Sequence, residues 1–591
     1  MKKYLMDILR LVIFSSILLG LFAAANFFFR PVWLATDNLG ARSGAPESVA
    51  NYSNLNAFEC VNYDTTEGFY ANPRNTIQTL FIGASMTTLG VSCTEMYENR
   101  GICAYSVSTE AQPILASYYW LKEGRRLHPE TLNTVVLDVS MLRREIGESF
   151  YKKSLDGMHF SKNKFDAAWD ASMKVMQEED EEGLESVEGA DPEDKNVARR
   201  AKVLEYLMPI FAYHDRWKEL GRNDFVKFNY DSRDYLRGFS LRTLSLLKRK
   251  EPGDIVVPEF KVDESAKPEK LSKKEKRYYK KIVEYCKENN LKLILIKTPS
   301  PETWNSAEHN AIQKLADKDG LTFIDFNYEP YLSEEGYVAA VDGTDKKHLN
   351  YYGAQKLTRW LGDYLADECG VEDVRGKAGY EFMDEQLATY KEKVEKVVEL
   401  KDITYLGTYL NMVSKNDRYV TFISTKNYRA SLIDDAQREM FRKMGLTKLA
   451  DLQDEEKYIG FIDKNGIVEN STSDPEEALI MKGVLPGSFD YDLESIGNGE
   501  KADSQINIGE FDFSINSPGI NIAVYDIDQH IVVDNTIFDT YPKVPYNTEK
   551  AYNEAVNNGL SYTDLPEILK NLYLYDERLG EAKEAALGKS E

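Results

Sequence analysis

Two side chains that lie far apart in the sequence, Ser85 and His348, could form the reactive part of a hydrolase site. Ser85 ends an apolar run in a Gly-x-Ser turn, and His348 ends an Asp-x-x-His segment. A hydroxyl becomes a nucleophile when a base takes its proton, and an imidazole is an effective base when a carboxylate fixes its tautomer. Asp345, three residues before His348, can reach the ring from behind. The sequence therefore predicts a catalytic triad of Ser85, His348 and Asp345, with Asp342 as the alternative orienting carboxylate.

Each motif also has an ordinary structural explanation. A serine at the end of a strand often caps the next helix, and His348 could be a surface loop residue next to Asn350, a helix N-cap. The two motifs occur together, however, in the order and at roughly the separation that a triad requires. Their combination favours catalysis over the structural explanation.

Both motifs together resemble the SGNH (GDSL-like) hydrolase superfamily. In that superfamily an early Ser follows the first strand, and a late Asp-x-x-His precedes the last helix. The closer resemblance is to its membrane-anchored, cell-surface branch, which includes the protein needed for D-alanylation of teichoic acids and the O-acetyltransferases of exopolysaccharide export. The resemblance covers roughly residues 70–368, with a long insertion. It implies an α/β fold and acyl transfer at the surface of a bacterium.

The resemblance also implies an oxyanion hole, whose donors stabilise the negative oxygen of the intermediate. The Ser85 backbone N–H is one donor by default. The second loop of the family corresponds to residues 104–112, where Ser106 and Gln112 are the candidate donors. The family places an Asn after the strand that corresponds to 134–139, and this chain has none there. The departure puts efficient hydrolysis in doubt and fits the cell-surface branch better than the secreted esterases.

The N-terminal segment predicts a membrane anchor. Residues 11–29 are apolar or small, which gives about 28 Å of helix, enough to cross a bilayer core. Lys2, Lys3 and Arg10 favour a cytoplasmic N-terminus. The alternative is a signal peptide cleaved near residues 23–25. Because the apolar run continues to Phe29, we expect an uncleaved signal anchor at 1–30, with the rest of the chain outside the cytoplasm.

Composition limits the classes of partner. The 591 residues suffice for two or three domains, and the net charge of −24 argues against a nucleic-acid partner. The 37 tyrosines could stack on sugar rings but are also common in cores. Of the five cysteines, Cys93 and Cys103 are close enough in sequence to pair, and geometry must decide. No zinc spacing occurs, so we expect no metal and no cofactor.

The apolar pattern of the middle region predicts a three-layer α/β domain over residues 71–370. Its expected strands are 79–83, 134–139, 291–297 and 321–326, and its expected helices are 112–126, 271–289, 306–318 and 352–367. Ligand sites of open α/β sheets lie at the carboxyl ends of the strands. We therefore expect the residues at the carboxyl ends of the strands to gather near His348; these are Ser85, Ser140, Thr298 and Asp325.

A long insertion interrupts the domain over about residues 141–270. Its acidic stretch 178–195 predicts a solvated loop. The family resemblance implies that the insertion covers the mouth of the site, where His214 and Arg216 could contact an acidic polymer or a phosphate. The alternative is a surface helix with Trp217 packed inward.

The remaining segments divide into a stalk, a spacer, a β-rich domain and a tail. We expect an irregular stalk at 31–70, a helical spacer at 371–400, a β-rich domain at 401–545 and a helical tail at 546–591. Asn465-Gly466 predicts a hairpin. Residues 519–526 and 531–540 resemble the interleukin-like EMT-inducer domain, although the helix at 434–444 precedes these strands instead of following them. By analogy the domain could hold a glycan, or it could merely pack on the α/β domain.

These features predict a cell-surface acyl transferase, most simply an O-acetyltransferase or an esterase, that acts on an envelope polysaccharide. The expected partners are a surface polysaccharide or cell-wall glycan, a membrane protein that donates the acyl group, and the membrane itself through the N-terminal helix. The alternative is a non-catalytic glycan-binding or envelope-assembly protein on a degenerate hydrolase fold.

Overall fold

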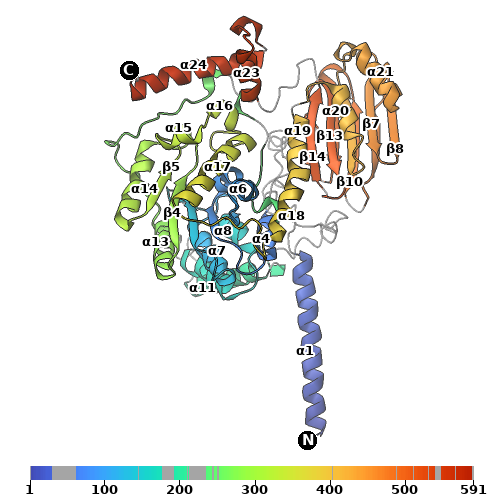
Figure 1. The fold of residues 1–591 in the computed structure, drawn as a ribbon. Coiled ribbons are helices and arrows are strands. Elements are labelled where there is room, and N and C mark those ends of the chain that lie inside the picture. The colour runs from blue at the N-terminus through green and yellow to red at the C-terminus, as the bar shows by residue number, and fades with distance from the viewer. Residues whose placement is uncertain are drawn as a thin grey trace.

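The structure of the chain is a computed structural model. It describes residues 2–29, 62–143, 146–175, 192–208, 210–211, 234–242, 245–248, 252–401, 403–486, 489–509, 511–529, 531–538, 548–565 and 567–588. Figure 1 shows an α/β body beside a β-rich domain, with helix α1 (Lys2–Phe29) extending away from both. The predicted fold class is confirmed.

A five-stranded parallel sheet in the order β2-β1-β3-β4-β5 forms the centre of the α/β body. Its strands are β1 (Thr79–Gly83), β2 (Ala104–Ser108), β3 (Thr134–Asp138), β4 (Lys292–Lys297) and β5 (Thr322–Asp325). Because β1 pairs with β3 on one side and with β2 on the other, the chain reverses direction across the sheet at β1. Such a switch point is where parallel sheets place their ligand sites.

Helices cover both faces of this sheet. Its alternate residues divide between two cores, with Leu80, Leu137 and Leu295 in one and Phe81, Val136 and Ile296 in the other. The first core is covered by α7 (Ile114–Leu127), α13 (Lys273–Glu288) and α14 (Ser306–Asp319). The second is covered by α6 (Cys93–Arg100) and α17 (Tyr351–Asp367). Nearly every strand position is buried, which explains the continuous apolar runs in the sequence.

The second strand was predicted as a loop, and this prediction was wrong. Residues 104–108 read Ala-Tyr-Ser-Val-Ser, which has no continuous apolar run, yet all five are buried in β2. The hydroxyl groups of the two serines hydrogen-bond to each other, since Ser106 Oγ lies 3.1 Å from Ser108 Oγ. The Ser106 N–H donates to the carbonyl of Arg237, so a segment of the insertion covers this edge of the sheet.

Part of the predicted stalk is helical. Helix α4 (Asn62–Ala71) packs on the α/β body, where Phe69 is fully buried against Trp120. The Tyr105 hydroxyl donates to the Thr65 carbonyl over 2.9 Å. These long-range contacts, and not local propensity, order the segment. The remaining stalk residues, 31–61, lie outside the described residues.

Short helical elements make up the described part of the insertion. They are η2 (Ser140–Arg143), α8 (Glu148–Asp156), α9 (Lys162–Trp169), η3 (Asp170–Val175), α11 (Pro192–Leu207), η6 (Asp234–Leu236), η7 (Leu246–Lys248) and η8 (Pro252–Asp254). The acidic stretch up to residue 191, His214, Arg216 and Trp217 lie outside the described residues.

Two antiparallel sheets form the β-rich domain, in the orders β14-β13-β6-β7-β8 and β12-β11-β10-β9. The first contains β6 (Tyr419–Lys426), β7 (Lys457–Asp463), β8 (Gly466–Thr472), β13 (Gly519–Asp526) and β14 (Ile531–Phe538). The second contains β9 (Leu479–Val484), β10 (Asp490–Ile496), β11 (Asp503–Ile508) and β12 (Phe511–Asp512). The hairpin predicted at Asn465-Gly466 joins β7 to β8. Residues of both sheets share one core.

Helices surround this domain and link it to the α/β body. Before it come α18 (Glu381–Tyr390), the π-helical turn η9 (Lys391–Glu395), α19 (Lys396–Lys401) and α20 (Leu406–Val413); within it lie α21 (Asp435–Met444) and α22 (Thr447–Asp451). The tail forms α23 (Thr548–Asn557) and α24 (Glu567–Leu587). Figure 1 shows α24 lying over the α/β body, where Leu572 and Tyr575 are buried with its second core.

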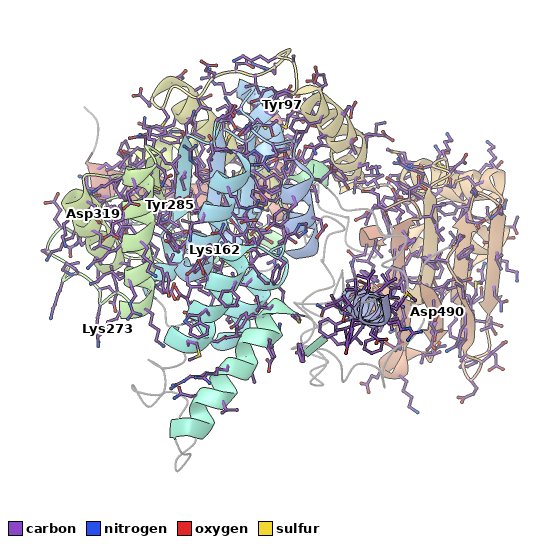
Figure 2. All side chains as sticks on the ribbon, turned by 90° about the horizontal axis from the view of Figure 1, so that it is seen from below. Tyr97, Lys162, Lys273, Tyr285, Asp319 and Asp490 are labelled. Carbon is purple, nitrogen blue, oxygen red and sulfur yellow. The ribbon has the colours of Figure 1, made fainter. Side chains whose placement is uncertain are left out.

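One hydrophobic core joins the two parts of the molecule. It contains residues of the insertion (Tyr235, Phe239 and Leu241), the start of α17 (Tyr351 and Ala354), and the helices and strands of the β-rich domain. The Tyr235 hydroxyl also donates to Gln529 in that domain. The β-rich domain therefore packs on the elements next to His348. Figure 2 shows the two parts side by side, with Tyr285 and Asp319 on one and Asp490 on the other.

Helix α1 is long and apolar enough to cross a membrane. Residues Tyr4–Asn26 have a mean hydropathy of 2.3 and are not buried in the protein. Their side chains point outward around the helix axis, as the end-on view in Figure 2 shows. Exposure of this apolar surface to water is unfavourable. Insertion into a bilayer would remove the surface from water.

Candidate active site

Ser85 is the first residue of helix α5 (Ser85–Gly90), and one residue, Ala84, separates it from the end of β1. The turn requires glycine at position 83, because a Cβ there would lie 2.6 Å from Asp138 Cβ and would also collide with Thr87 Oγ1. The Thr87 hydroxyl donates to Asp138 Oδ2 over 3.1 Å, which ties α5 to the end of β3. Gly83 thus allows the two strand ends and the helix to approach one another closely.

Replacing Gly83 with alanine is expected to destabilise the fold and displace Ser85. The added methyl group has no space between two buried neighbours, so we expect a loss of about 1–3 kcal/mol in the free energy of unfolding. Denaturant unfolding of the purified chain measures this loss. Gly253→Ala, at an open position outside the site and without a positive φ, is the control for glycine replacement. Equal stability of Gly83→Ala and wild type would contradict the packing argument.

His348 and Asp345 meet Ser85 from the loop between α16 (Ala339–Asp342) and α17. Ser85 Oγ lies 2.8 Å from His348 Nε2, and His348 Nδ1 lies 2.8 Å from Asp345 Oδ2. Asp345 Oδ1 also accepts the backbone N–H groups of Lys347 and His348, so its carboxylate orders the turn that carries the histidine. The hydroxyl, the imidazole and the carboxylate form one chain of contacts.

An arginine that the sequence analysis did not single out completes this arrangement. Arg242, in the insertion, places Nη1 3.2 Å from Asp345 Oδ2. Its carbonyl accepts the N–H of Tyr351, the first residue of α17. The insertion thus contributes a cation to the site. No local pattern marked Arg242, because its contact spans 103 residues.

These charges set the protonation states of the pair. Burial is the largest effect on Asp345 and opposes ionisation, but the hydrogen bond and charge of His348, together with backbone N–H groups and Arg242, hold its pKa well below the ordinary value. Burial is also the largest effect on His348 and lowers its pKa, against the hydrogen bond and charge of Asp345. A neutral imidazole beside an ionised carboxylate is the state that can accept a proton from Ser85.

Asp342, the alternative orienter, does not contact His348. Its Oδ2 accepts the Val338 N–H over 2.7 Å and the Lys356 ammonium over 2.9 Å. Burial raises the pKa of Asp342 to about 6. The residue stabilises the start of α17, since its carbonyl accepts the Asn350 N–H. Asp345 is therefore the carboxylate that faces the imidazole.

The two side chains proposed as oxyanion donors are engaged elsewhere. Both N–H groups of the Gln112 amide are in use, donating to the Val107 carbonyl over 3.1 Å and to Ser117 Oγ over 3.0 Å. Ser106 points to Ser108 inside β2. Within the described part of the chain, neither side chain has a hydrogen bond to Ser85 or His348. Their contacts stabilise β2 and the start of α7 and do not contribute to the site.

The other residues at the strand ends have separate partners. Ser140, after β3, donates to Asp138 Oδ1 through both its N–H and its hydroxyl. The carboxylate of Asp325, the last residue of β5, lies 2.7 Å from His309 Nδ1 and accepts the indole N–H of Trp304 at the same distance. The contacts of Ser140 and Asp325 therefore brace the loops at this edge of the sheet, and none of them reaches His348.

A buried lysine at the same edge was also missed. Lys297, the last residue of β4, is fully buried and donates to the Thr298 carbonyl over 2.8 Å and to Ser300 Oγ. Its ammonium lies 3.5 Å from the sulfur of Met86, the residue after Ser85. Lys297 was missed because a lysine at the end of an apolar run is usually interpreted as the solvent-exposed end of a strand.

Cys93, Cys103, Cys286 and Cys369 are free thiols, so the pairing of Cys93 with Cys103 that the sequence left open does not occur; Cys60 lies outside the described residues. Among the described residues no group of three or more His, Cys, Asp or Glu side chains could hold a metal ion.

No family model matches the chain, and no curated protein matches it. Among solved structures, the chain is similar to a "putative acylhydrolase" from Bacteroides fragilis, at 11% sequence identity and a TM-score of 0.22. That match covers 51% of this chain and 94% of the other. A TM-score this low does not establish a shared fold. The proposed chemistry is therefore inferred from the residues of the site alone.

Proposed function

We propose that the chain is a cell-surface enzyme that transfers a small acyl group, in the first place acetyl, to or from a hydroxyl of an envelope polysaccharide. The observation that carries the proposal is the contact chain from Ser85 Oγ through His348 to the Asp345 carboxylate. Its order and geometry are those of a serine nucleophile with its base and orienting group. The roles of the three residues are proposals.

The reaction would proceed in two steps. Ser85 Oγ attacks the acyl carbon while its proton moves to His348 Nε2, and the same imidazole returns the proton to the leaving oxygen. A hydroxyl of the acceptor then attacks the acyl-serine and gives its proton to His348, which passes the proton to Ser85 Oγ as the acyl–serine bond breaks. Water as the acceptor gives an esterase, and a sugar hydroxyl gives a transferase. The Ser85 N–H, in the first turn of α5, is our proposed backbone donor to the oxyanion.

The location follows from α1 and from the family resemblance. A single N-terminal anchor with a cytoplasmic start would place the site outside the cytoplasm of a bacterium, next to surface polysaccharide and cell-wall glycan. An activated acyl donor made inside the cell would then have to cross the membrane. We therefore propose a membrane protein that donates the acyl group as partner, and no nucleic-acid partner, in keeping with the net charge of −24.

One observation favours the second candidate function, a non-catalytic glycan-binding or assembly protein. The side chains expected to complete the oxyanion hole, Ser106 and Gln112, are committed to β2 and α7. A site with one backbone donor would stabilise the intermediate poorly. The two functions differ in whether Ser85 forms an acyl-enzyme.

Acetyl transfer can be tested with an activated acetyl ester and the detergent-purified full chain. We expect acetate release, and we expect added neutral polysaccharide to divert part of the acetyl group from water to sugar hydroxyls, detected as acetylated glycan by mass spectrometry. Acetate release that no glycan diverts would assign an esterase. No acetate release and no acetylated glycan would favour the non-catalytic function.

The pH dependence tests the role of Arg242 as a positioning residue. His348 must be neutral to accept a proton, and its lowered pKa predicts that activity persists below pH 6.5 and is lost as the pH falls through that pKa. Arg242 disfavours the imidazolium, so Arg242→Gln is expected to raise the His348 pKa and move the acid limb of the pH–rate profile to higher pH. Arg200→Gln, at an exposed position of helix α11, is the control. An unmoved acid limb would contradict this role.

A further inference from the structure

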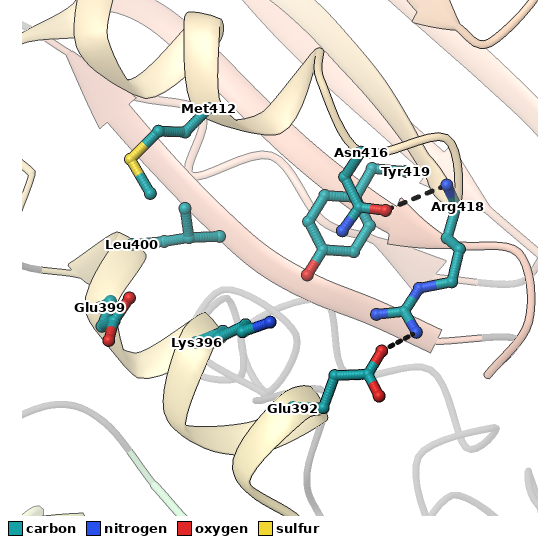
Figure 3. A pocket seen from close by; sticks show the side chains of 8 residues that line it. All are labelled: Glu392, Lys396, Glu399, Leu400, Met412, Asn416, Arg418 and Tyr419. Carbon is teal, nitrogen blue, oxygen red and sulfur yellow. Dashed lines mark hydrogen bonds and ion pairs between the residues drawn. The ribbon is translucent and has the colours of Figure 1, made fainter. Parts of the chain in front are cut away.

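A cavity lies between the spacer helices and the β-rich domain. It has a volume of about 430 Å³ and is lined by the eight side chains labelled in Figure 3. The helical segment η9–α19 provides one wall, while α20 and the start of β6 provide the other. This volume lies within the range of small-molecule sites. Nothing in the acyl-transfer chemistry uses the cavity.

The helical wall presents charges of both signs. Glu392, Lys396 and Glu399 recur at helical spacing, so they line one face. Lys396 and Glu399 are exposed, and neither forms an ion pair with any other residue that the structure describes. Opposite charges three positions apart commonly pair with each other. The Lys396 ammonium and the Glu399 carboxylate can therefore interact with a ligand in the cavity.

The opposite wall combines an aromatic ring with polar groups. Tyr419 is only 8% exposed, and Figure 3 shows its hydroxyl pointing into the cavity, toward Lys396. Burial raises the pKa of Tyr419 to about 12, so its phenol remains a hydrogen-bond donor at neutral pH. Asn416, which also lines the cavity, is oriented by its Oδ1, which accepts the backbone N–H of Arg418 over 3.1 Å. Leu400 and Met412 supply the apolar part of the lining.

The charges of the lining cancel. Glu392 and Glu399 oppose Lys396 and Arg418, and Arg418 Nη1 is already bound to Glu392 Oε1 over 2.9 Å. A cavity with no net charge does not select an anion or a cation. It offers acceptors for hydroxyl protons, donors for hydroxyl oxygens, and a ring and two aliphatic chains for an apolar face. A pyranose ring has hydroxyl groups that donate and accept hydrogen bonds and an apolar face, so it matches all of these groups.

We propose that this cavity binds neutral pyranose units of a glycan. The wall that carries Lys396 and Glu399 continues into α18, which is fixed to the α/β body: the Tyr390 hydroxyl donates to Glu95 Oε1 over 2.5 Å. A glycan held here is therefore tethered to the same body as Ser85, which raises the effective concentration of acceptor hydroxyls. That last step rests on the proposed acyl transfer, whereas the binding does not.

Binding can be measured on the full chain carrying Ser85→Ala, so that no turnover interferes. The probes are cellotetraose, maltotetraose and chitotetraose as neutral tetrasaccharides, with tetragalacturonate as an anionic and a glucosamine tetramer as a cationic comparison. Saturation-transfer NMR and calorimetry are expected to show binding of at least one neutral probe with a Kd of about 1 mM or tighter, and weaker binding of both charged probes.

Two lining variants locate the binding. Lys396→Met and Glu399→Gln remove charges without removing bulk, and each is expected to weaken binding about tenfold. The matched controls Lys415→Met and Glu385→Gln change exposed residues outside the cavity and are expected to bind as well as the parent chain. Failure of every neutral probe, stronger binding of a charged probe, or equal binding by the lining variants would each overturn the proposal. Ester turnover by the chain with Ser85 intact remains a separate result.

Discussion

Replacing Ser85 by alanine is expected to abolish turnover of an activated acetyl ester, with a loss of about 10³-fold or more in kcat. The reason is that Ser85 Oγ is the hydroxyl that contacts the proposed base, 2.8 Å from His348 Nε2. The fold should not change, because the variant removes one oxygen at the start of a short helix.

A nearby serine provides the control for this variant. Ser140→Ala removes a buried hydroxyl at the neighbouring strand end, bonded to Asp138 and not to the imidazole. We expect Ser140→Ala to keep most of its turnover, even if its stability falls. The measurement is the rate of acetate release at saturating ester, beside a thermal unfolding curve for each variant. Equal rates for wild type and Ser85→Ala would show that the ester is hydrolysed somewhere else.

Replacing Asp345 by asparagine is expected to lower kcat by about 10³–10⁴-fold with little change in KM. The amide of the variant could still hold the ring but would no longer stabilise its charged form or fix the tautomer that leaves Nε2 free for Ser85. The variant would also remove the carboxylate that Arg242 Nη1 contacts at position 345. Steady-state kinetics from pH 5 to 9 measure both effects.

Asp342→Asn is the matched control for this prediction, because Asp342 is also buried in the region just before His348 but faces Val338 and Lys356. Its expected effect is on stability and not on kcat. If Asp342→Asn reduced kcat as much as Asp345→Asn, the carboxylates would act through the fold of the loop and not through the imidazole.

The sequence predicted the α/β body well because its strands are buried on both faces. A continuous apolar run such as 134–139 has few other interpretations, and the structure forms β3 over Thr134–Asp138. In the β-rich domain, residues 519–526 form β13 with the predicted bounds. Strand β2 was missed because it has no continuous apolar run. Its two serines are buried through a hydrogen bond to each other, which a search for apolar runs does not detect.

The candidate site was predictable only where its signals were local. The turn before Ser85 and the Asp-x-x-His segment are short motifs whose spacing carries chemical meaning; their catalytic roles stay predictions. Arg242 and Lys297 act through long-range contacts that no local pattern encodes. Gln112 shows the converse error: a donor amide close to a strand end looked available, but its partners, Val107 and Ser117, lie within a few residues of it.

The most direct test of the account is covalent trapping of Ser85. A serine-reactive fluorophosphonate requires an activated hydroxyl but no acyl donor, glycan or membrane partner, so it probes the contact chain itself. We predict one adduct, mapped by peptide mass spectrometry to Ser85, that disappears in His348→Ala. No adduct on the folded wild-type chain, or an adduct whose yield does not depend on His348, would contradict the claim that Ser85, His348 and Asp345 form a catalytic triad.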